Sequence, residues 1–190
     1  TNHTPNWMRR RLIRAGMRSI SLAVDVTNYV MLDLGQPMHA YDLDKIEGPI
    51  VVRRAAEGEK LTTLDGKEHD LSVEDLLITD SPDGKRGSRI LGIAGVMGGL
   101  YGEVTADTKN ILLEAAHFDS VSIARSARRH KIPSEASRRF ERGVDTQLQP
   151  AAAQMAAELL TKFGNGEPSG HPTDVNTTMY RLSLIHISEP

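Results

Sequence analysis

The chain has 190 residues, 39% of them hydrophobic and 25% charged, which is typical of a globular domain with one sizeable core and not of a disordered segment. The formal net charge of −2 excludes a general attraction to nucleic acid, so a polyanion site requires a local basic cluster. The absence of cysteine excludes disulfides, thiolate nucleophiles and cysteine-based zinc sites, and it fits a reducing cytoplasm.

The N-terminal residues predict a short basic helix over residues 5–15. Thr4 is suited to the N-cap, Pro5 fits the first helical position, and Gly16 is a natural stop. The arginines of this helix are typical of a solvated face. The chain begins TNHTPNWMRRR, without an apolar signal-peptide core or an initiator methionine, so we expect a fragment or a processed piece. No run in the sequence is long and apolar enough to span a membrane.

A second helix is predicted to end at Gly35, because Val26 and Val30 recur at helical spacing and glycine is a common C-terminal cap. Gln36-Pro37 then breaks the pattern, and the residues from Met38 onward are expected to leave as a strand. The whole stretch DVTNYVMLDLGQPMHAYD thereby places a histidine, His39, close to a helix end.

The middle of the chain is rich in predicted strands. Asp65-Gly66 is a strong signal for a tight hairpin. We expect strands over residues 50–54, 61–64, 68–71, 76–79, 89–94 and 110–115. Asp119 suits the N-cap of a helix through residue 129, and a last helix is predicted from Pro150 to Gly164. The order indicates an α+β (mixed α/β) fold, with a mostly antiparallel or mixed central sheet and flanking helices.

Three features of this pattern carry possible chemistry. His39 has nitrogens suited to a base, a water-positioning group or a metal ligand, although a lone histidine is more often structural. The loop GVMGG brings backbone N–H groups close to a ligand, but a tight turn is the commoner meaning. Glu114 interrupts an apolar run, which indicates either a buried functional acid or an outward-facing residue.

A basic stretch follows in the C-terminal half. It is suited to nucleic-acid phosphates, although a solvated helix face with intrahelical ion pairs is the commoner meaning. Its basic residues are Arg125, Arg128, Arg129, His130, Lys131, Arg138, Arg139 and Arg142.

Four motifs in one order, DVTNYVMLDLGQPMHAYD, GIAGVMGG, ILLEAAHFD and SEASRRFERGVD, resemble the tRNA-binding and editing region (B3/B4 domain) of bacterial phenylalanyl-tRNA synthetase beta subunits. The resemblance covers about residues 7–170. It implies catalytic roles for His39, Thr27 and Glu114, and substrate binding by Asn28, Gly95, Gly98, Gly99, Ser134 and Ala136. Ser134 replaces the family's threonine but keeps a hydroxyl group.

The resemblance also implies a function. We expect residues 1–178 to form a cytoplasmic editing domain, with residues 1–20 as a lead-in, that binds tRNA(Phe) and hydrolyses wrongly attached tyrosine. Its expected partner is the synthetase alpha subunit in a heterotetramer, without a membrane. No cofactor or metal is expected for the domain, since ATP and Mg²⁺ serve the whole enzyme. The alternatives are a catalytically silent tRNA-binding or subunit-assembly module, and a solute-binding module. Residues 179–190 look like a non-native tail.

Overall fold

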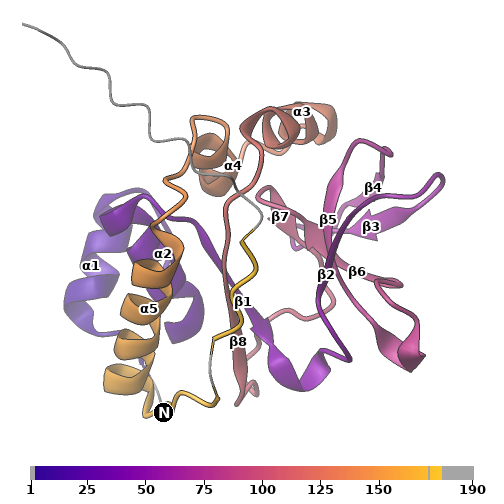
Figure 1. The fold of residues 1–190 in the computed structure, drawn as a ribbon. Coiled ribbons are helices and arrows are strands. Elements are labelled where there is room, and N and C mark those ends of the chain that lie inside the picture. Colours follow the sequence, from indigo (N-terminus) through magenta and orange to yellow (C-terminus); the bar gives the residue numbers. More distant parts are fainter. Residues whose placement is uncertain (1–2, 171, 177–190) are drawn as a thin grey trace, which may run out of the picture.

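A computed structural model describes residues 3–170 and 172–176. The predicted tail, residues 179–190, lies outside this part. These described residues contain five α-helices, two short 3-10 helices and eight strands. Figure 1 shows their arrangement. The helices are α1 (Asn6–Arg14), α2 (Leu22–Leu34), α3 (Ser120–His130), α4 (Glu135–Phe140) and α5 (Gln149–Gly164). The strands are β1 (Met38–Asp42), β2 (Val51–Arg54), β3 (Lys60–Thr62), β4 (Glu68–Asp70), β5 (Leu76–Asp80), β6 (Arg89–Ile93), β7 (Met97–Gly98) and β8 (Ile111–Ala115).

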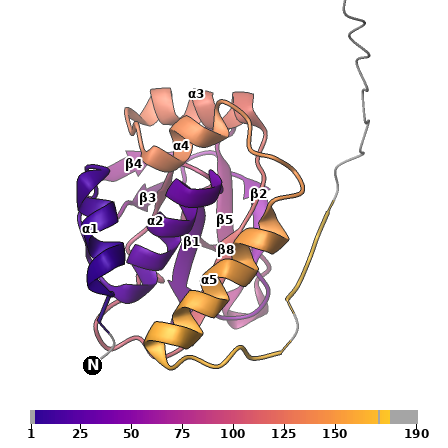
Figure 2. The same ribbon diagram turned by 90° about the vertical axis from the view of Figure 1, so that its left-hand side faces the viewer.

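The α+β class is confirmed, and every strand pair is antiparallel. The strands divide among three small sheets instead of joining in one: a β1–β8 ribbon, a four-stranded sheet in the order β2-β5-β6-β7, and the β3–β4 hairpin. The ribbon lies in the middle of the molecule, between a layer of α1, α2 and α5 and the other two sheets, with α3 and α4 above (Figure 1). Figure 2 shows the helix layer in front of the ribbon.

The β1–β8 ribbon separates two hydrophobic cores. Met38 and Leu113 pack against the core formed by α1, α2 and α5, whereas Tyr41 and Leu112 belong to the core shared with the other sheets. Successive side chains of a strand point to opposite faces. His39 therefore shares the face of Tyr41, away from α2.

Both ends of α2 follow from its sequence. The Ser21 hydroxyl accepts a hydrogen bond from the Val24 N–H at 3.4 Å, and Gly35 takes the left-handed conformation with φ of 78°. The predicted stop at Gly35 is confirmed. Only glycine adopts this conformation without a steric penalty, so the chain turns here into β1.

One predicted helix cap is wrong. Helix α1 has Pro5 as its N-cap, and the Thr4 hydroxyl instead donates to buried Asp25 at 2.5 Å. The predicted end of the last helix at Gly164 is confirmed, and Asn165 follows it as a left-handed cap with φ of 52°. An asparagine tolerates this conformation better than most residues.

The described residues contain no helix long and apolar enough to cross a membrane.

Candidate functional site

The β1–β8 pairing brings predicted site residues together. His39 lies directly opposite Glu114 in the antiparallel register, and such facing residues have Cβ atoms about 4.5–5.5 Å apart. The Tyr41 hydroxyl donates a hydrogen bond to Glu114 Oε2 at 2.8 Å. The rings of His39 and Tyr41 pack edge to face, with centroids 4.5 Å apart. We call His39, Tyr41, Gly98 and Glu114 the His39–Glu114 cluster.

Gly98 joins this cluster from β7, on the neighbouring sheet. A Cβ atom at position 98 would lie 2.8 Å from His39 Cε1 and 2.9 Å from Nε2, closer than real Cβ contacts allow. The Gly98 carbonyl accepts a hydrogen bond from Leu64 N–H at 3.0 Å, which fixes the strand in this position. Glycine is therefore required here because the backbone closely approaches the imidazole.

Burial determines the charge state of His39. It lowers the pKa of the imidazole to about 4, because the charged form loses hydration without a compensating acid. Glu114 faces the ring, but its own carboxylate accepts from Tyr41. His39 is consequently neutral at pH 7 and has a nitrogen able to accept a proton.

Burial acts on Glu114 and Tyr41 as well. Glu114 is half-buried as a residue, but burial of its carboxyl group raises the pKa, and the hydrogen bond from Tyr41 opposes this shift. Burial, together with the nearby Glu114 charge, raises the pKa of the Tyr41 hydroxyl well above its usual value. Tyr41 therefore remains a hydrogen-bond donor at any physiological pH.

Sequence reasoning missed Tyr41, although a signal existed. Tyr41 follows His39 by two residues in a predicted strand, and side chains two apart share a face of a strand. The same alternation places Glu114 and Leu112 together on β8. Applied to both strands, this alternation would have placed Tyr41 on the same face as His39 and Glu114.

Thr27 and Asn28 lie in the middle of α2, which packs against the other face of the ribbon. The buried Thr27 hydroxyl donates to the Val24 carbonyl of its own helix at 2.9 Å. Within the described part of the chain, no hydrogen bond joins Thr27 or Asn28 to the His39–Glu114 cluster. Their proposed roles stay predictions.

The other glycines of the GVMGG loop have packing roles. A Cβ atom at Gly95 would lie 2.9 Å from the Phe140 ring, and one at Gly99 would lie 2.8 Å from Leu61 Cδ1. The Gly99 N–H donates to the Leu91 carbonyl at 2.7 Å. The loop is a tight turn between β6 and β7, and among its glycines Gly98 is the one whose added Cβ would meet His39.

A cavity of about 460 Å³ has Met97 in its lining, and we call it the Met97 cavity; none of the four cluster residues lines it. Met97, the neighbour of Gly98 in β7, lines it together with His69 of β4 and Ser134. Ser134 is the N-cap of α4 and accepts a hydrogen bond from the Ser137 N–H at 3.0 Å. Ala136 packs against the adjacent hydrophobic core.

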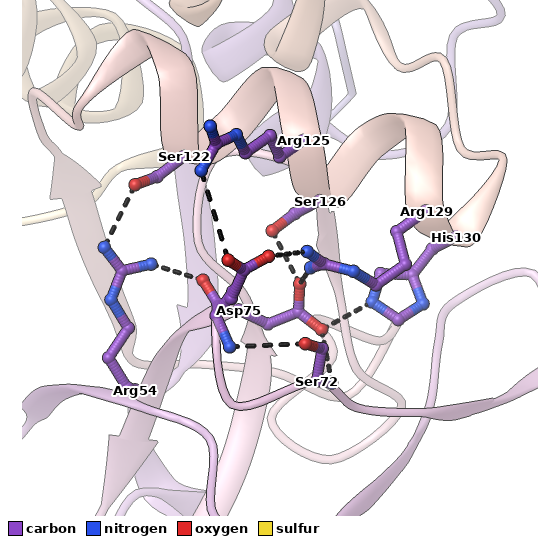
Figure 3. A network of polar contacts seen from close by, with 9 residues as sticks. Arg54, Ser72, Asp75, Ser122, Arg125, Ser126, Arg129 and His130 are labelled. Atoms are coloured by element: carbon purple, nitrogen blue, oxygen red, sulfur yellow. Dashed lines mark hydrogen bonds and ion pairs between the residues drawn. The ribbon is translucent and has the colours of Figure 1, made fainter.

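The basic stretch takes part in ion pairs. Arg129 contacts Glu74 and the buried Asp75 on the β4–β5 side (Figure 3). Glu135 pairs with Arg138 at 3.1 Å and with Arg139 at 2.9 Å within α4. These contacts fit the expected ion-paired helix faces, and they also connect α3 to the sheet. Among residues 3–170 and 172–176, no group of three His, Asp or Glu side chains is placed to hold a metal ion.

Known proteins match this chain over most of its length. The profile of the B3/4 domain family covers residues 1–165. A phenylalanine–tRNA ligase beta subunit of Bifidobacterium longum is 89% identical over 97% of this chain, and one of Streptomyces avermitilis is 56% identical over 92%. The chain spans only about a fifth of these relatives, 21% and 20% of their lengths.

A solved structure has a similar fold. It is an N-terminal fragment of the phenylalanyl-tRNA synthetase beta subunit from Pyrococcus horikoshii, with a TM-score of 0.51. The match covers 75% of this chain and 40% of that one at 18% sequence identity. At this identity the likeness concerns the fold alone.

Proposed function

The chain belongs to the B3/4 domain family, and from this premise we propose that it is the editing part of a phenylalanine–tRNA ligase, hydrolysing tyrosine wrongly attached to tRNA(Phe). The matched relatives carry the name phenylalanine–tRNA ligase beta subunit. We propose that the charging reaction, with its ATP and Mg²⁺, belongs to the rest of the enzyme and its alpha subunit.

The observation that carries this proposal is the convergence of His39, Gly98 and Glu114. They come from three strands on two different sheets. His39 lies opposite Glu114 in the β1–β8 register, and its ring lies against the Gly98 backbone. A neutral imidazole, a carboxyl group with a raised pKa and a close backbone strand form a combination suited to ester hydrolysis in a partly dry site.

Glu114 supplies the selectivity in this proposal. Tyrosine and phenylalanine differ by one hydroxyl, which an apolar synthetic pocket rejects only weakly. A buried carboxyl acceptor would bind the hydroxyl of tyrosine and stay unpaired beside phenylalanine, at a cost of about 1–3 kcal/mol. Tyr41 engages Oε2, so the substrate hydroxyl would use Oε1.

His39 orients the attacking water in the proposed reaction. Its low pKa leaves the ring neutral, and an imidazole nitrogen accepts the hydrogen bond of a water aimed at the ester carbonyl. The N–H groups of Val96 and Gly99 already donate to the carbonyls of Ile93 and Leu91. These two amides are therefore not available to stabilise the negative charge that develops on the ester carbonyl oxygen during hydrolysis.

One observation favours a second function, a silent tRNA-binding or subunit-assembly module. The Tyr41 hydroxyl already occupies Glu114 as a tyrosine ligand would. If Tyr41 does not share the carboxylate, the acceptor is closed. The domain would then bind tRNA without hydrolysing the ester.

The test is release of tyrosine from tyrosyl-tRNA(Phe) by the full chain and by its Glu114→Gln variant. We expect Glu114→Gln to slow hydrolysis by about tenfold or more, because a charge-assisted acceptor is lost. Exposed Glu141→Gln is the matched control and should keep the original rate. Unchanged hydrolysis in Glu114→Gln contradicts the proposed selectivity, and tRNA binding without hydrolysis in the unmodified chain supports the silent module.

A further inference from the structure

We propose that Tyr41 is a positioning residue for Glu114: it holds one carboxyl oxygen in place so that the other oxygen selects a ligand that carries a phenolic hydroxyl. This inference rests on the proposed function and adds a residue to it. The Tyr41 hydroxyl donates to Oε2 at 2.8 Å, and within the described residues no side chain donates to Oε1. Tyr41 therefore acts through Glu114 and not on the ester.

The backbone of Tyr41 is held from both sides. Tyr41 pairs with Leu112 of β8 in the antiparallel register, and an isolated antiparallel bridge joins it to Glu103 on its other side. The next residue, Asp42, donates its N–H to the Gly102 carbonyl at 2.9 Å. A strand with partners on both edges cannot shift without breaking hydrogen bonds, so the position from which the Tyr41 side chain starts is fixed.

Packing fixes the ring of Tyr41 as well. The residue is only 4% exposed and belongs to the core that the ribbon shares with the other sheets. Its ring meets the His39 ring edge to face, and a Cβ atom at Gly102 would lie 3.4 Å from Tyr41 Cδ1. A close-packed side chain leaves its rotamer only at a cost in free energy. The hydroxyl is consequently presented to Glu114 in one orientation.

Glu114 depends on this hydroxyl for the orientation of its carboxyl group. It lies on β8, half-buried, with a long side chain that has several rotatable bonds. Within the described residues it accepts one side-chain hydrogen bond, from Tyr41. Hydrogen bonds to an ionised group are short and strong, so this one restricts the carboxylate. Without it, a ligand would have to order the carboxylate on binding and would lose affinity.

The same hydrogen bond favours the charge state that distinguishes tyrosine from phenylalanine. An ionised carboxyl group only accepts hydrogen bonds, whereas a protonated one also donates. An ionised group left unpaired beside a phenylalanine ring costs more free energy than a neutral one. Burial raises the pKa of Glu114, and the hydrogen bond from Tyr41 opposes this shift. Loss of the hydroxyl therefore increases the protonated fraction and weakens the discrimination.

Few other titratable groups face Glu114. His39 lies opposite it and is neutral above its pKa of about 4, and the β7 segment Met97–Gly98 carries no charge. Helix α5 packs on the opposite face of the ribbon, and the charged side chains of the 3-10 turn Leu43–Lys45 are bonded near the Ile111 end of β8. Among the described residues, burial and Tyr41 account for the pKa shift of Glu114.

The first test compares two probes that differ by one hydroxyl, L-tyrosinamide and L-phenylalaninamide, titrated into the full chain and into its Tyr41→Phe variant. This variant keeps the ring beside His39 and loses the hydroxyl. The ratio of the two affinities, tyrosinamide over phenylalaninamide, should fall about 3- to 10-fold in Tyr41→Phe. Tyr101→Phe removes an exposed tyrosine hydroxyl and should keep the ratio. An unchanged ratio in Tyr41→Phe, or no preference for tyrosinamide in the unmodified chain, overturns the positioning role.

The pH dependence of this ratio separates positioning from packing. Both probes carry the same amino group and meet the same His39, so their ratio follows the charge of Glu114. The preference for tyrosinamide should weaken as pH falls through the pKa of Glu114, and in Tyr41→Phe it should weaken at a higher pH. Raising the pH should restore part of the preference in the variant. A lower ratio without a shift along the pH axis would reflect lost packing and overturns the proposal.

Neither probe carries an ester, so binding and hydrolysis are judged separately. If Tyr41→Phe lowers the ratio and shifts its pH dependence while tyrosyl-tRNA(Phe) is not hydrolysed, the positioning role stands and the editing function fails. If hydrolysis proceeds while Tyr41→Phe keeps the ratio of the unmodified chain, the editing function stands and the positioning role fails.

Discussion

Asp75 and Glu114 are two carboxyl groups beside histidines in one domain, and their surroundings differ. Asp75 is fully buried and accepts from Ser126, Arg129, His130 and the Ser72 N–H. Burial opposes its ionisation, but these donors outweigh burial, so the pKa of Asp75 lies below its usual value. Within the described residues Glu114 accepts one side-chain hydrogen bond, from the Tyr41 hydroxyl, and burial raises its pKa. A saturated carboxylate supports the fold, whereas an unsaturated one has capacity left for a ligand.

The largest expected effect is on stability, at the fully hydrogen-bonded carboxylate of Asp75. Asp75→Asn removes a charge that neutralises Arg129 and binds His130, and we expect the free energy of unfolding to fall by about 3–5 kcal/mol. Urea denaturation measures this loss. Asp70→Asn is the control, since that side chain is 86% exposed, and it should change stability little. A loss below about 1 kcal/mol for Asp75→Asn would show that the network is not a structural support.

The pH dependence of stability tests the charge state of His39, the histidine that faces Glu114. The folded pKa of His39 is about 4 and its ordinary value is 6.5, so between these values the unfolded chain binds more protons. Stability should therefore fall as pH decreases from 6.5 towards 4, by up to about 3 kcal/mol from this group. Denaturation curves at several pH values measure this, and the free energy of unfolding should depend less steeply on pH in His39→Gln than in the unmodified chain. Exposed His117→Gln should retain the original slope, and equal slopes in both variants would contradict a half-buried, neutral His39.

Gly98→Ala tests the close approach that completes the cluster. The added methyl group would meet the His39 ring at 2.8 Å, and we expect a destabilisation of about 1–3 kcal/mol from overpacking. Thermal denaturation, together with the NMR shifts of the His39 ring, measures it. At Gly166 a Cβ atom would have only ordinary contacts, the nearest at 3.6 Å, so Gly166→Ala should be nearly neutral. Similar behaviour of both variants would mean that His39 moves aside freely.

The smallest effect concerns the Tyr41 hydroxyl, which donates to Glu114. Tyr41→Phe should cost about 1 kcal/mol, and the pKa of Glu114 should rise further, because the hydrogen bond that favours the charged form is lost. An NMR titration of the Glu114 carboxyl carbon follows the pKa. Tyr101→Phe removes an exposed hydroxyl bonded to the Lys45 carbonyl at 2.9 Å and should leave that titration unaltered. A lower pKa of Glu114 in Tyr41→Phe would contradict the assigned donor.

Local patterns predicted the secondary structure well. Gly35, the Asp65-Gly66 turn and the Asp119 cap lie where the sequence placed them, because each acts through its own backbone. The Thr4 cap was wrong because a distant carboxylate, Asp25, attracts its hydroxyl. Helix and capping propensities depend on neighbours in the chain and do not include such long-range partners.

The candidate site was only partly accessible from sequence. Their own patterns named His39 and Glu114 separately, and the family resemblance alone joined them, because their pairing depends on the β1–β8 register between residues far apart in the chain. The division of the strands among three sheets was likewise not contained in the strand periodicity. The surroundings of Tyr41 and of the buried His69 Nε2 could not be predicted from the strand pattern either, since tertiary packing alone defines them.

The long connection between the two strands of the ribbon has a consequence for folding. Residues 43–110 lie between β1 and β8, so His39 meets Glu114 only after this intervening segment has brought the strands together. Closing such a loop is entropically costly, and contacts of high sequence separation form slowly. A ribosome must also finish β8 before the cluster exists. Assembly of the His39–Glu114 cluster thus reports on completion of most of the domain, and a chain ending before Ile111 would lack it entirely.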